Sequence, residues 1–147
     1  MRHRKCAFHP QVCDYGGEPF IFNIHHATDM NEKFRTTLWT GQDMQLTLMS
    51  VPVRCDIGIE MHGDVDQFIR IESGKAKVFT GNCRNGLRET ACVDGNYAII
   101  IPAGTWHNIV NVGNRPLKLY SLYSPPQHPF GTVHQTKEDA EHGEHQE

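Results

Sequence analysis

Apolar and polar residues alternate along short runs in the middle of the chain, and glycine-containing turns separate these runs. The turn glycines from Gly74 to Gly113 recur every 9 to 12 residues, a spacing typical of short antiparallel strands. The dipeptide Asn85-Gly86 favours a type I′ hairpin, in which both central residues need positive φ. No helical period competes with this pattern, which predicts strands at Phe34–Thr40, Met44–Val51, Cys55–His62, Gln67–Glu72, Ala76–Thr80, Leu87–Val93, Tyr97–Ile101, Trp106–Val112 and Leu117–Tyr123.

The two ends of the chain lack this alternation. Residues 1–20 are interrupted by proline and glycine, and residues 124–147 begin with a proline-rich stretch and end in an acidic one. We therefore expect an N-terminal extension over 1–20, one β domain over 21–123 and a C-terminal tail over 124–147.

One short helix is expected in the tail. Thr136 is followed three positions later by Asp139, which resembles the N-cap pattern that begins many helices. The sequence predicts a helix over Lys137–His142.

The strand pattern makes the fold class all-β. A chain of many short strands must protect the edges of its sheets, and a closed β-barrel or a two-sheet jelly roll does so at this length. The 147 residues, 38% of them hydrophobic, suffice for one buried core and not for two domains of normal size.

Charge and hydropathy exclude several classes of partner. The net charge of -3 provides no positive field for nucleic acid or an anionic membrane surface. The mean hydropathy is -0.51, and no apolar run approaches the roughly 20 residues of a transmembrane helix. A secretory signal has an apolar stretch after its basic start, and the basic start of this chain is not followed by one. We expect a soluble, cytoplasmic protein.

The five cysteines are odd in number and contain no CxxC pair, which favours reduced thiols over a disulfide framework. Cys6, His9 and Cys13 could form a metal cluster, but ordinary buried or solvated side chains are the simpler interpretation.

Candidate metal ligands gather around residues 58–74. Glu60 and His62 are two positions apart on an extended segment, so their side chains project from the same face and can meet one ion. The same period selects Gln67 over Asp66 on the next strand and directs Ile69 inward. Asp64 or Asp66 remains an alternative oxygen ligand to Gln67.

A second imidazole follows a Pro-x-Gly turn at Pro102, which delivers His107 onto a new strand. Glu60, His62 and His107 together provide two histidines and one carboxylate, a set that suits divalent metals with open coordination positions, and the Gln67 oxygen is a weaker fourth ligand.

The chain resembles the cupin superfamily, whose two short motifs lie on neighbouring strands of a small jelly-roll β-barrel. The second motif, P-x-G-x2-H-x3-N, is matched fully, by Pro102, Gly104, His107 and Asn111. In the first motif the usual positions H-x-H, then Glu, then Gly are held by Glu60, His62, Gln67 and Gly74. The spacing of the motif is kept, but Glu60 stands in place of the first histidine and Gln67 in place of the glutamate. The tail looks like that of small bacterial cupins grouped with phosphomannose isomerase-like proteins.

The resemblance implies one divalent metal ion per chain and an isomerase-type, metal-dependent reaction on a small, sugar-like molecule. Zinc, nickel, iron(II) and manganese are all compatible with the exchanged ligands. Two alternatives stay open: an iron(II)-dependent dioxygenase, which the two-histidine, one-carboxylate set supports, and a ligand-binding or regulatory cupin without turnover. No catalytic base is evident in the sequence.

Several residues cannot be assigned from sequence. Flanking segments often line the ligand pockets of barrels, so the roles of four histidines stay open, namely His25, His26, His128 and His134. The positions of Arg35, Arg54 and Arg70 relative to any cavity are also open. The outward-facing Phe68 would be costly to expose, and we expect a homodimer.

Overall fold

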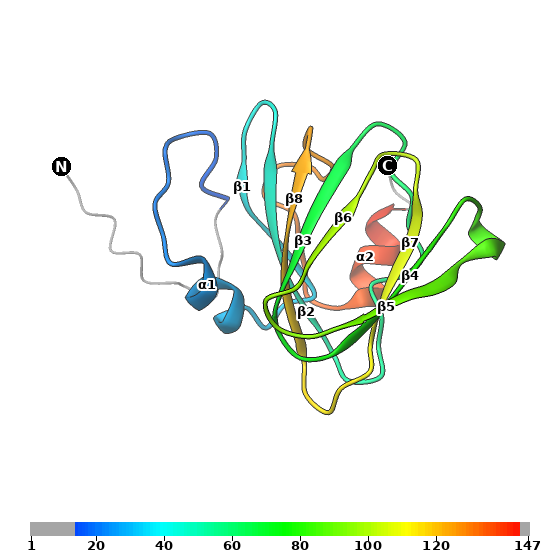
Figure 1. The fold of residues 1–147 in the computed structure, drawn as a ribbon. Helices are drawn as coiled ribbons and strands as arrows, with labels where there is room; N and C mark the ends of the chain where they lie inside the picture. Colours follow the sequence, from blue (N-terminus) through cyan, green and yellow to red (C-terminus); the bar gives the residue numbers. More distant parts are fainter. Residues whose placement is uncertain (1–13, 145–147) are drawn as a thin grey trace.

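The computed structural model describes residues 14–144, which form two antiparallel sheets packed face to face with two short α-helices at their margins (Figure 1). The elements, in chain order, are α1 (Ile24–Met30), β1 (Arg35–Thr40), β2 (Gln45–Val51), β3 (Asp66–Ser73), β4 (Ala76–Gly81), the 3-10 turn η1 (Arg84–Gly86), β5 (Arg88–Val93), β6 (Ala98–Ile101), β7 (Trp106–Asn111), β8 (Leu117–Ser124), β9 (Val133–His134) and α2 (Lys137–Glu144). The predicted strands are confirmed to within one residue at each end, except over 55–62.

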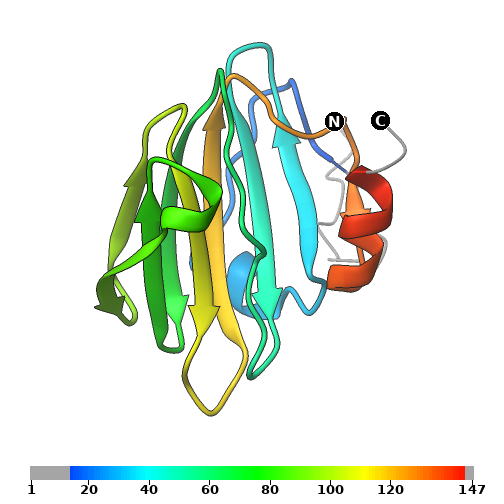
Figure 2. The ribbon, with the colours of Figure 1, turned by 90° about the vertical axis from the view of Figure 1, so that its right-hand side faces the viewer.

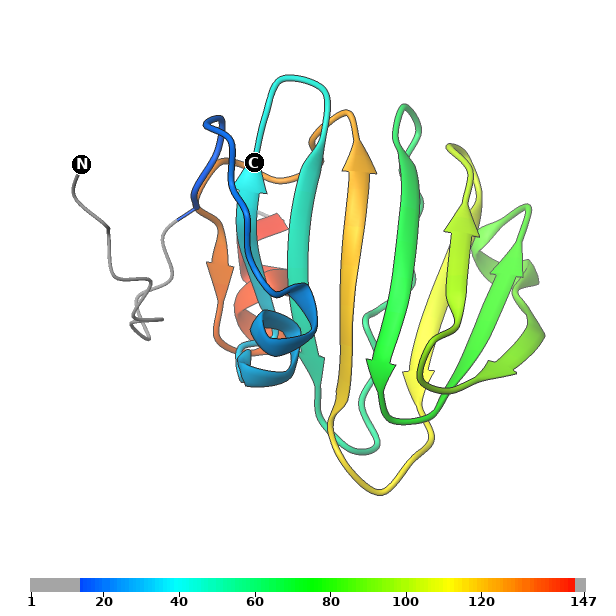
Figure 3. The same cartoon turned by 60° about the vertical axis from the view of Figure 1, so that its left-hand side comes forward.

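Six strands make the larger sheet, in the order β6-β3-β8-β2-β1-β9, and three make the smaller, in the order β5-β4-β7. Figure 3 shows the larger sheet nearly face-on, with α1 lying against its outer surface, and Figure 2 shows α2 beside the β1 and β9 edge. The late strand β8 lies between β3 and β2, so residues distant in sequence become neighbours in the sheet.

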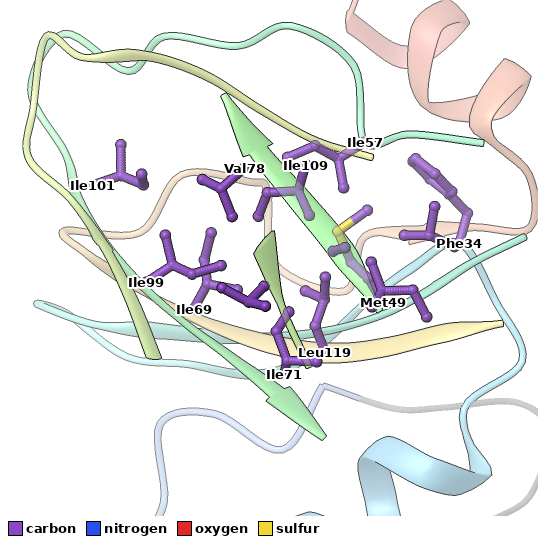
Figure 4. Close-up of a cluster of buried hydrophobic side chains, with 14 of the residues drawn as sticks. Phe34, Met49, Ile57, Ile69, Ile71, Val78, Ile99, Ile101, Ile109 and Leu119 are labelled. Atoms are coloured by element: carbon purple, nitrogen blue, oxygen red, sulfur yellow. The ribbon is translucent and has the colours of Figure 1, made fainter. Parts of the chain in front are cut away.

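Apolar side chains from both sheets meet between them (Figure 4). Along β3, buried Gln67, Ile69 and Ile71 alternate with half-buried Phe68 and Arg70, so the inward face inferred from the period of two is confirmed. The same core includes, from other elements, Met49, Val78, Ile99, Ile101, Ile109 and Leu119.

A row of apolar residues crosses the outer face of the larger sheet. Ile100, Phe68, Leu122, Leu46 and Trp39 are register neighbours on β6, β3, β8, β2 and β1. Residues of α1 and of the segment before it cover most of the row, so Phe68 is half-buried within the chain itself, whereas Ile100, at the uncovered end, is 71% exposed.

The sheets are not closed into a barrel by hydrogen bonds, contrary to the β-barrel expectation. On the β7 side, the predicted strand Cys55–His62 does not form a regular strand. In the described chain it runs beside β7 but makes only two isolated bridges, Asp56 to Val110 and Glu60 to His107. Gly58 lies between the bridges with a φ of +93°. This conformation interrupts the regular ladder of hydrogen bonds by which the segment would pair with β7 as a strand.

Two further local expectations need correction. Asn85-Gly86 is part of η1 and neither residue has positive φ, so the turn is not type I′. Helix α1 was not predicted, since seven residues are too few to show a helical period; Asn23 caps it by accepting a 2.9 Å hydrogen bond from the backbone N–H of His26.

The C-terminal helix is confirmed and extends to Glu144. The amide of Asp139 donates to Oγ1 of Thr136, and the amide of Thr136 donates to Oδ2 of Asp139, which is a reciprocal cap. Ala140 packs into the core, and β9 pairs with β1. The domain boundaries stay a prediction. Among the described helices, neither is long and apolar enough to cross a membrane.

Candidate metal centre

Two backbone contacts join the two sequence motifs. Glu60 and His107 exchange both of their backbone hydrogen bonds, each 2.9 Å long, so they are directly opposed and their side chains share one face. The amide of Gly104 donates to the carbonyl of His62 at 2.8 Å. The turn before β7 therefore fixes the strand segment that carries the other two candidate ligands.

The three side chains converge on one carboxylate oxygen. Oε2 of Glu60 lies 3.4 Å from Nε2 of His62 and 3.7 Å from Nε2 of His107, and the potential ligand atoms of the three residues all lie within 4.8 Å of one another. His107 is fully buried, and the side chains of Glu60 and His62 are 12% and 9% exposed. A cation of small radius can contact all three from one point.

Hydrogen bonding sets the tautomer of His107. Its Nδ1 lies 3.0 Å from the carbonyl oxygen of Thr105, which can only accept, so Nδ1 carries the proton and the lone pair of Nε2 faces Glu60. Burial lowers the pKa of His107, although the Thr105 carbonyl and Glu60 act in the opposite direction. The ring is therefore a neutral imidazole at neutral pH, the form that binds metals.

Glu60 is held ionised. Burial alone would raise its pKa, but His62, Arg35 and His107 together lower it overall. Nη2 of Arg35 donates to Oε1 of Glu60 at 3.3 Å, so Oε2 is the oxygen that faces the two ring nitrogens and a shared cation.

The residues fit a divalent ion, as their unpaired atoms show. Nε2 of His62, Nε2 of His107 and Oε1 of Gln67 are buried and have no hydrogen-bond partner in the described structure. Buried polar atoms without partners are rare in folded proteins because each costs about 1–3 kcal/mol. A cation coordinated by these atoms would satisfy them, so the candidate site at Glu60, His62 and His107 fits a metal by chemistry as well as by shape.

Gln67 is buried on β3, where its Nε2 donates to Oγ of Ser121 at 3.2 Å. This contact turns the amide so that Oε1, the better ligand atom, is the unpaired one. Asp64 and Asp66 are exposed and lie outside the cluster, and Oδ1 of Asp66 accepts from the amide of Ala103 at 2.9 Å. Asp66 thus anchors the Pro102–Gly104 turn.

Sequence reasoning did not place four residues that surround the cluster. Arg35 is fully buried beside Glu60, and its Nη1 also lies 3.3 Å from Nδ1 of His134. Tyr123 presents its ring edge-on to His62 and His128, at centroid distances of 5.7 and 5.4 Å. An arginine at the start of a strand and a tyrosine among alternating apolar residues carry no sequence signal of such a role.

Burial keeps two of these groups uncharged. It raises the pKa of Tyr123 to about 12, helped by Glu60 and opposed by Arg35 and the hydroxyls of Thr47 and Ser121. It lowers the pKa of His128 to about 3, with Arg35 acting in the same direction. At neutral pH the site is lined by a neutral phenol and a neutral imidazole.

The two histidines of α1 lie away from the cluster. His25 and His26 are exposed on α1, on the outer side of the larger sheet, and Nδ1 of His25 contacts Oε2 of Glu72 at 2.6 Å. Asn111 of the second motif is structural, because its side-chain amide donates to the carbonyls of Val51, Pro52 and Arg115. The alternative cluster of Cys6, His9 and Cys13 lies outside the described residues.

The architecture and the site together define a class. The chain superposes on the cupin domain of Cnp3 from Schizosaccharomyces pombe with a TM-score of 0.50 and 17% identity, over 57% of each chain. At that identity the likeness concerns the fold. Two antiparallel sheets with a His/Glu cluster between them give this protein a jelly-roll fold like that of cupin domains, with a candidate metal site.

Nearer relatives define the family. The chain is 56% identical to the YrkC protein of Bacillus subtilis over 127 residues, which cover 86% of this chain and 68% of YrkC. It matches the crystal structure of BH2720 from Bacillus halodurans with a TM-score of 0.87 and 53% identity, over 89% of this chain and 99% of that one. No model of a known protein family matches the sequence. The chain belongs to the family of YrkC and BH2720.

Proposed function

We propose that the protein is a metal-dependent enzyme of small-molecule metabolism in which Glu60, His62 and His107 hold one divalent ion and Gln67 supplies a fourth, neutral oxygen. The observation that carries the proposal is the pair of buried ring nitrogens, Nε2 of His62 and Nε2 of His107, that have no partner and face the same carboxylate. Most buried polar atoms in folded proteins have a hydrogen-bond partner, and a cation beside Glu60 would supply one to both ring nitrogens.

A bound divalent ion would supply Lewis-acid activation of a hydroxyl or carbonyl oxygen. The chain's own residues do the rest. Arg35 holds Oε1 of Glu60 and so fixes the carboxylate, the Thr105 carbonyl fixes the ring of His107, and the buried surroundings exclude bulk water. Tyr123, with its raised pKa, keeps its proton at neutral pH and can donate a hydrogen bond to a substrate oxygen.

The isomerase-type reaction that the phosphomannose isomerase-like resemblance implies moves a proton between adjacent carbons of a sugar-like substrate. The zinc-, nickel-, manganese- and iron(II)-loaded proteins should be incubated with aldoses and ketoses in deuterated water. Isomer formation with deuterium at the exchanged carbon, absent in His107→Ala, would support it; no exchange with any metal would exclude it.

A second candidate is an iron(II)-dependent dioxygenase. It is favoured by the ligand set, since two imidazoles and one carboxylate are the combination found in non-haem iron oxygenases. Oxygen consumption by the iron(II)-loaded protein with phenolic or thiol substrates, and none with the zinc-loaded protein, separates this reaction from isomerisation.

A cupin that binds its ligand without turnover is the remaining alternative. Thermal stabilisation by a metabolite without formation of any product would favour this binder over both enzymes. The sugars, phenols and thiols of the two preceding tests answer the question, with unfolding temperature and product measured on one sample.

We also propose a cytoplasmic homodimer with no nucleic-acid or membrane partner. The exposed end of the outer apolar row, at Ile100, supports self-association. Light scattering should give about twice the 16.7 kDa chain mass, and Ile100→Lys should lower it. Because Phe68 is covered within the chain, Phe68→Ala should affect folding stability more than dimer mass. A wild-type monomer at micromolar concentration would contradict the proposal.

A further inference from the structure

A pocket of about 350 Å³ opens beside the candidate metal centre, between α2 and the segment that leads to Glu60. Its volume lies at the lower end of the range for small-molecule sites. Its lining includes the candidate ligand Glu60 and Arg35, which is paired with Glu60, so a molecule in the pocket would lie beside one of the three candidate ligands.

The charges at the back of this pocket do not balance once an ion is present. The structure pairs Arg35 with Glu60, and the side chains are 1% and 12% exposed. A divalent cation bound to Oε2 of Glu60 would be neutralised by the same carboxylate that neutralises Arg35. His62 and His107 would add no negative charge, because they bind metals as neutral rings. The buried dication and guanidinium then share a single carboxylate. Uncompensated buried charge is costly, so an anion that binds in the pocket beside Arg35 would be favoured.

The mouth of the pocket provides a further cation. Arg84, on η1, is exposed, and its guanidinium lies 5.9 Å above the ring of Trp106, which directs it without neutralising it. Lys137 also lines the pocket, but it is paired with Asp56. The acidic Glu141 lies opposite, on α2. Arg84 is thus the guanidinium best placed to receive an anion that enters.

The remaining lining identifies the kind of anion. Ile57, Ile59 and Ala140 supply apolar wall, and Gly58 supplies backbone. Such a wall suits the hydrocarbon part of an organic molecule and offers nothing to an inorganic phosphate. A guanidinium and a divalent ion both bind carboxylates well.

We infer that this pocket binds the carboxylate of a small organic acid, between Arg84 and the metal centre, and that the substrate of the protein is such an acid. The inference rests on the proposed metal-dependent function and narrows its substrate class. It assigns a substrate-positioning role to Arg84, which no motif contains.

The test uses the full-length, zinc-loaded protein and calorimetric titration with three probes: butyrate, its neutral isostere butyramide, and inorganic phosphate. Butyrate should bind saturably, and butyramide about tenfold more weakly or not at all, because it lacks the charge. Arg84→Gln should weaken butyrate binding by about tenfold, Arg84→Lys by less, and Arg115→Gln, a control at an exposed arginine between β7 and β8, should have no effect.

Zinc content is measured on every variant, because it distinguishes failure of the carboxylate site from failure of the metal site. Wild-type protein that binds zinc but gives equal affinities for butyrate and butyramide, or prefers phosphate, would overturn the inference and leave the metal site intact. An unchanged butyrate affinity in Arg84→Gln would also overturn it. Wild-type protein that binds no zinc or other divalent ion would overturn the proposed function and, with it, this inference.

Discussion

The amide of Gly104 donates a 2.8 Å hydrogen bond to the carbonyl of His62, so the glycine of one cupin motif holds the histidine of the other. Gly104 can do so because its φ is +84°, a conformation that residues with a Cβ rarely adopt. The geometry of the metal site therefore depends on a backbone feature outside the ligand set.

We predict that Gly104→Ala weakens both folding and metal binding. A Cβ at this position would meet no atom within 4 Å, so the cost is the strained backbone alone, about 1 kcal/mol or more. Relief of this strain shifts the contact to His62 and lowers metal affinity. Gly63→Ala is the matched control, because it also has open space and does not have positive φ. Denaturant unfolding and metal titration measure both effects, and identical behaviour of the two variants would contradict the prediction.

Elemental analysis should find about one divalent ion per chain. His62→Ala and His107→Ala should lose the ion while the fold is retained. Since a structural zinc site gains about 10–16 kcal/mol from four ligands, each histidine contributes about 3 kcal/mol, or about 100-fold in affinity. Glu60→Gln should weaken binding less, because it keeps an oxygen donor. Asp64→Asn, an exposed neighbour, serves as the control. A stoichiometry near zero after expression with added metal would exclude the site.

Metal-linked stability should depend on pH. The ion requires neutral imidazoles, whose reference pKa is about 6.5, so protons compete with it on acidification. The metal-loaded protein should melt at a higher temperature than the chelated protein near pH 8, and the difference should shrink below about pH 6. A difference that stays constant from about pH 8 to 5 would mean that His62 and His107 are not the principal ligands.

The chelated protein should also lose stability in acid, through His128. Its folded pKa of about 3 lies below its unfolded value of about 6.5, so the unfolded chain binds the proton first. The unfolding free energy therefore rises with pH between these values and falls on acidification, by about 2–3 kcal/mol at pH 4.5 from this residue. Urea unfolding at pH 7 and 4.5 should show a smaller loss in His128→Gln than in wild type. His142→Gln, an exposed histidine on α2, should match wild type.

The strands could be predicted from short apolar runs between turn glycines, and most securely where apolar and polar residues alternate. β3 is the clearest case, where Gln67, Ile69 and Ile71 face inward as expected. The convergence of Glu60, His62 and His107 followed from the same period and from motif spacing. Both signals depend only on residues close together in the sequence, so a single sequence is enough to show them.

The surroundings of the site could not be predicted, because they depend on how distant strands pair. Arg35 of β1 in the larger sheet reaches Glu60, whose segment bridges to β7 of the smaller sheet, only through the packing of the two sheets. Tyr123 reaches His62 only because β8 enters the centre of the larger sheet. Asn85-Gly86 shows the reverse case: a strong local turn signal gave way to the 3-10 turn that joins β4 to β5.

The position of β8 also governs how the chain can fold during synthesis. Its partners β2 and β3 are both translated earlier, yet neither can complete its pairing until residues 117–124 have left the ribosome. Contacts between distant segments raise the entropic cost of folding and slow it. Until β8 arrives, β2 and β3 each present an open edge rich in apolar residues, the kind of edge that aggregates. The nascent chain therefore passes through a stage at which all its candidate metal ligands are present but the sheet beside them is still unfinished.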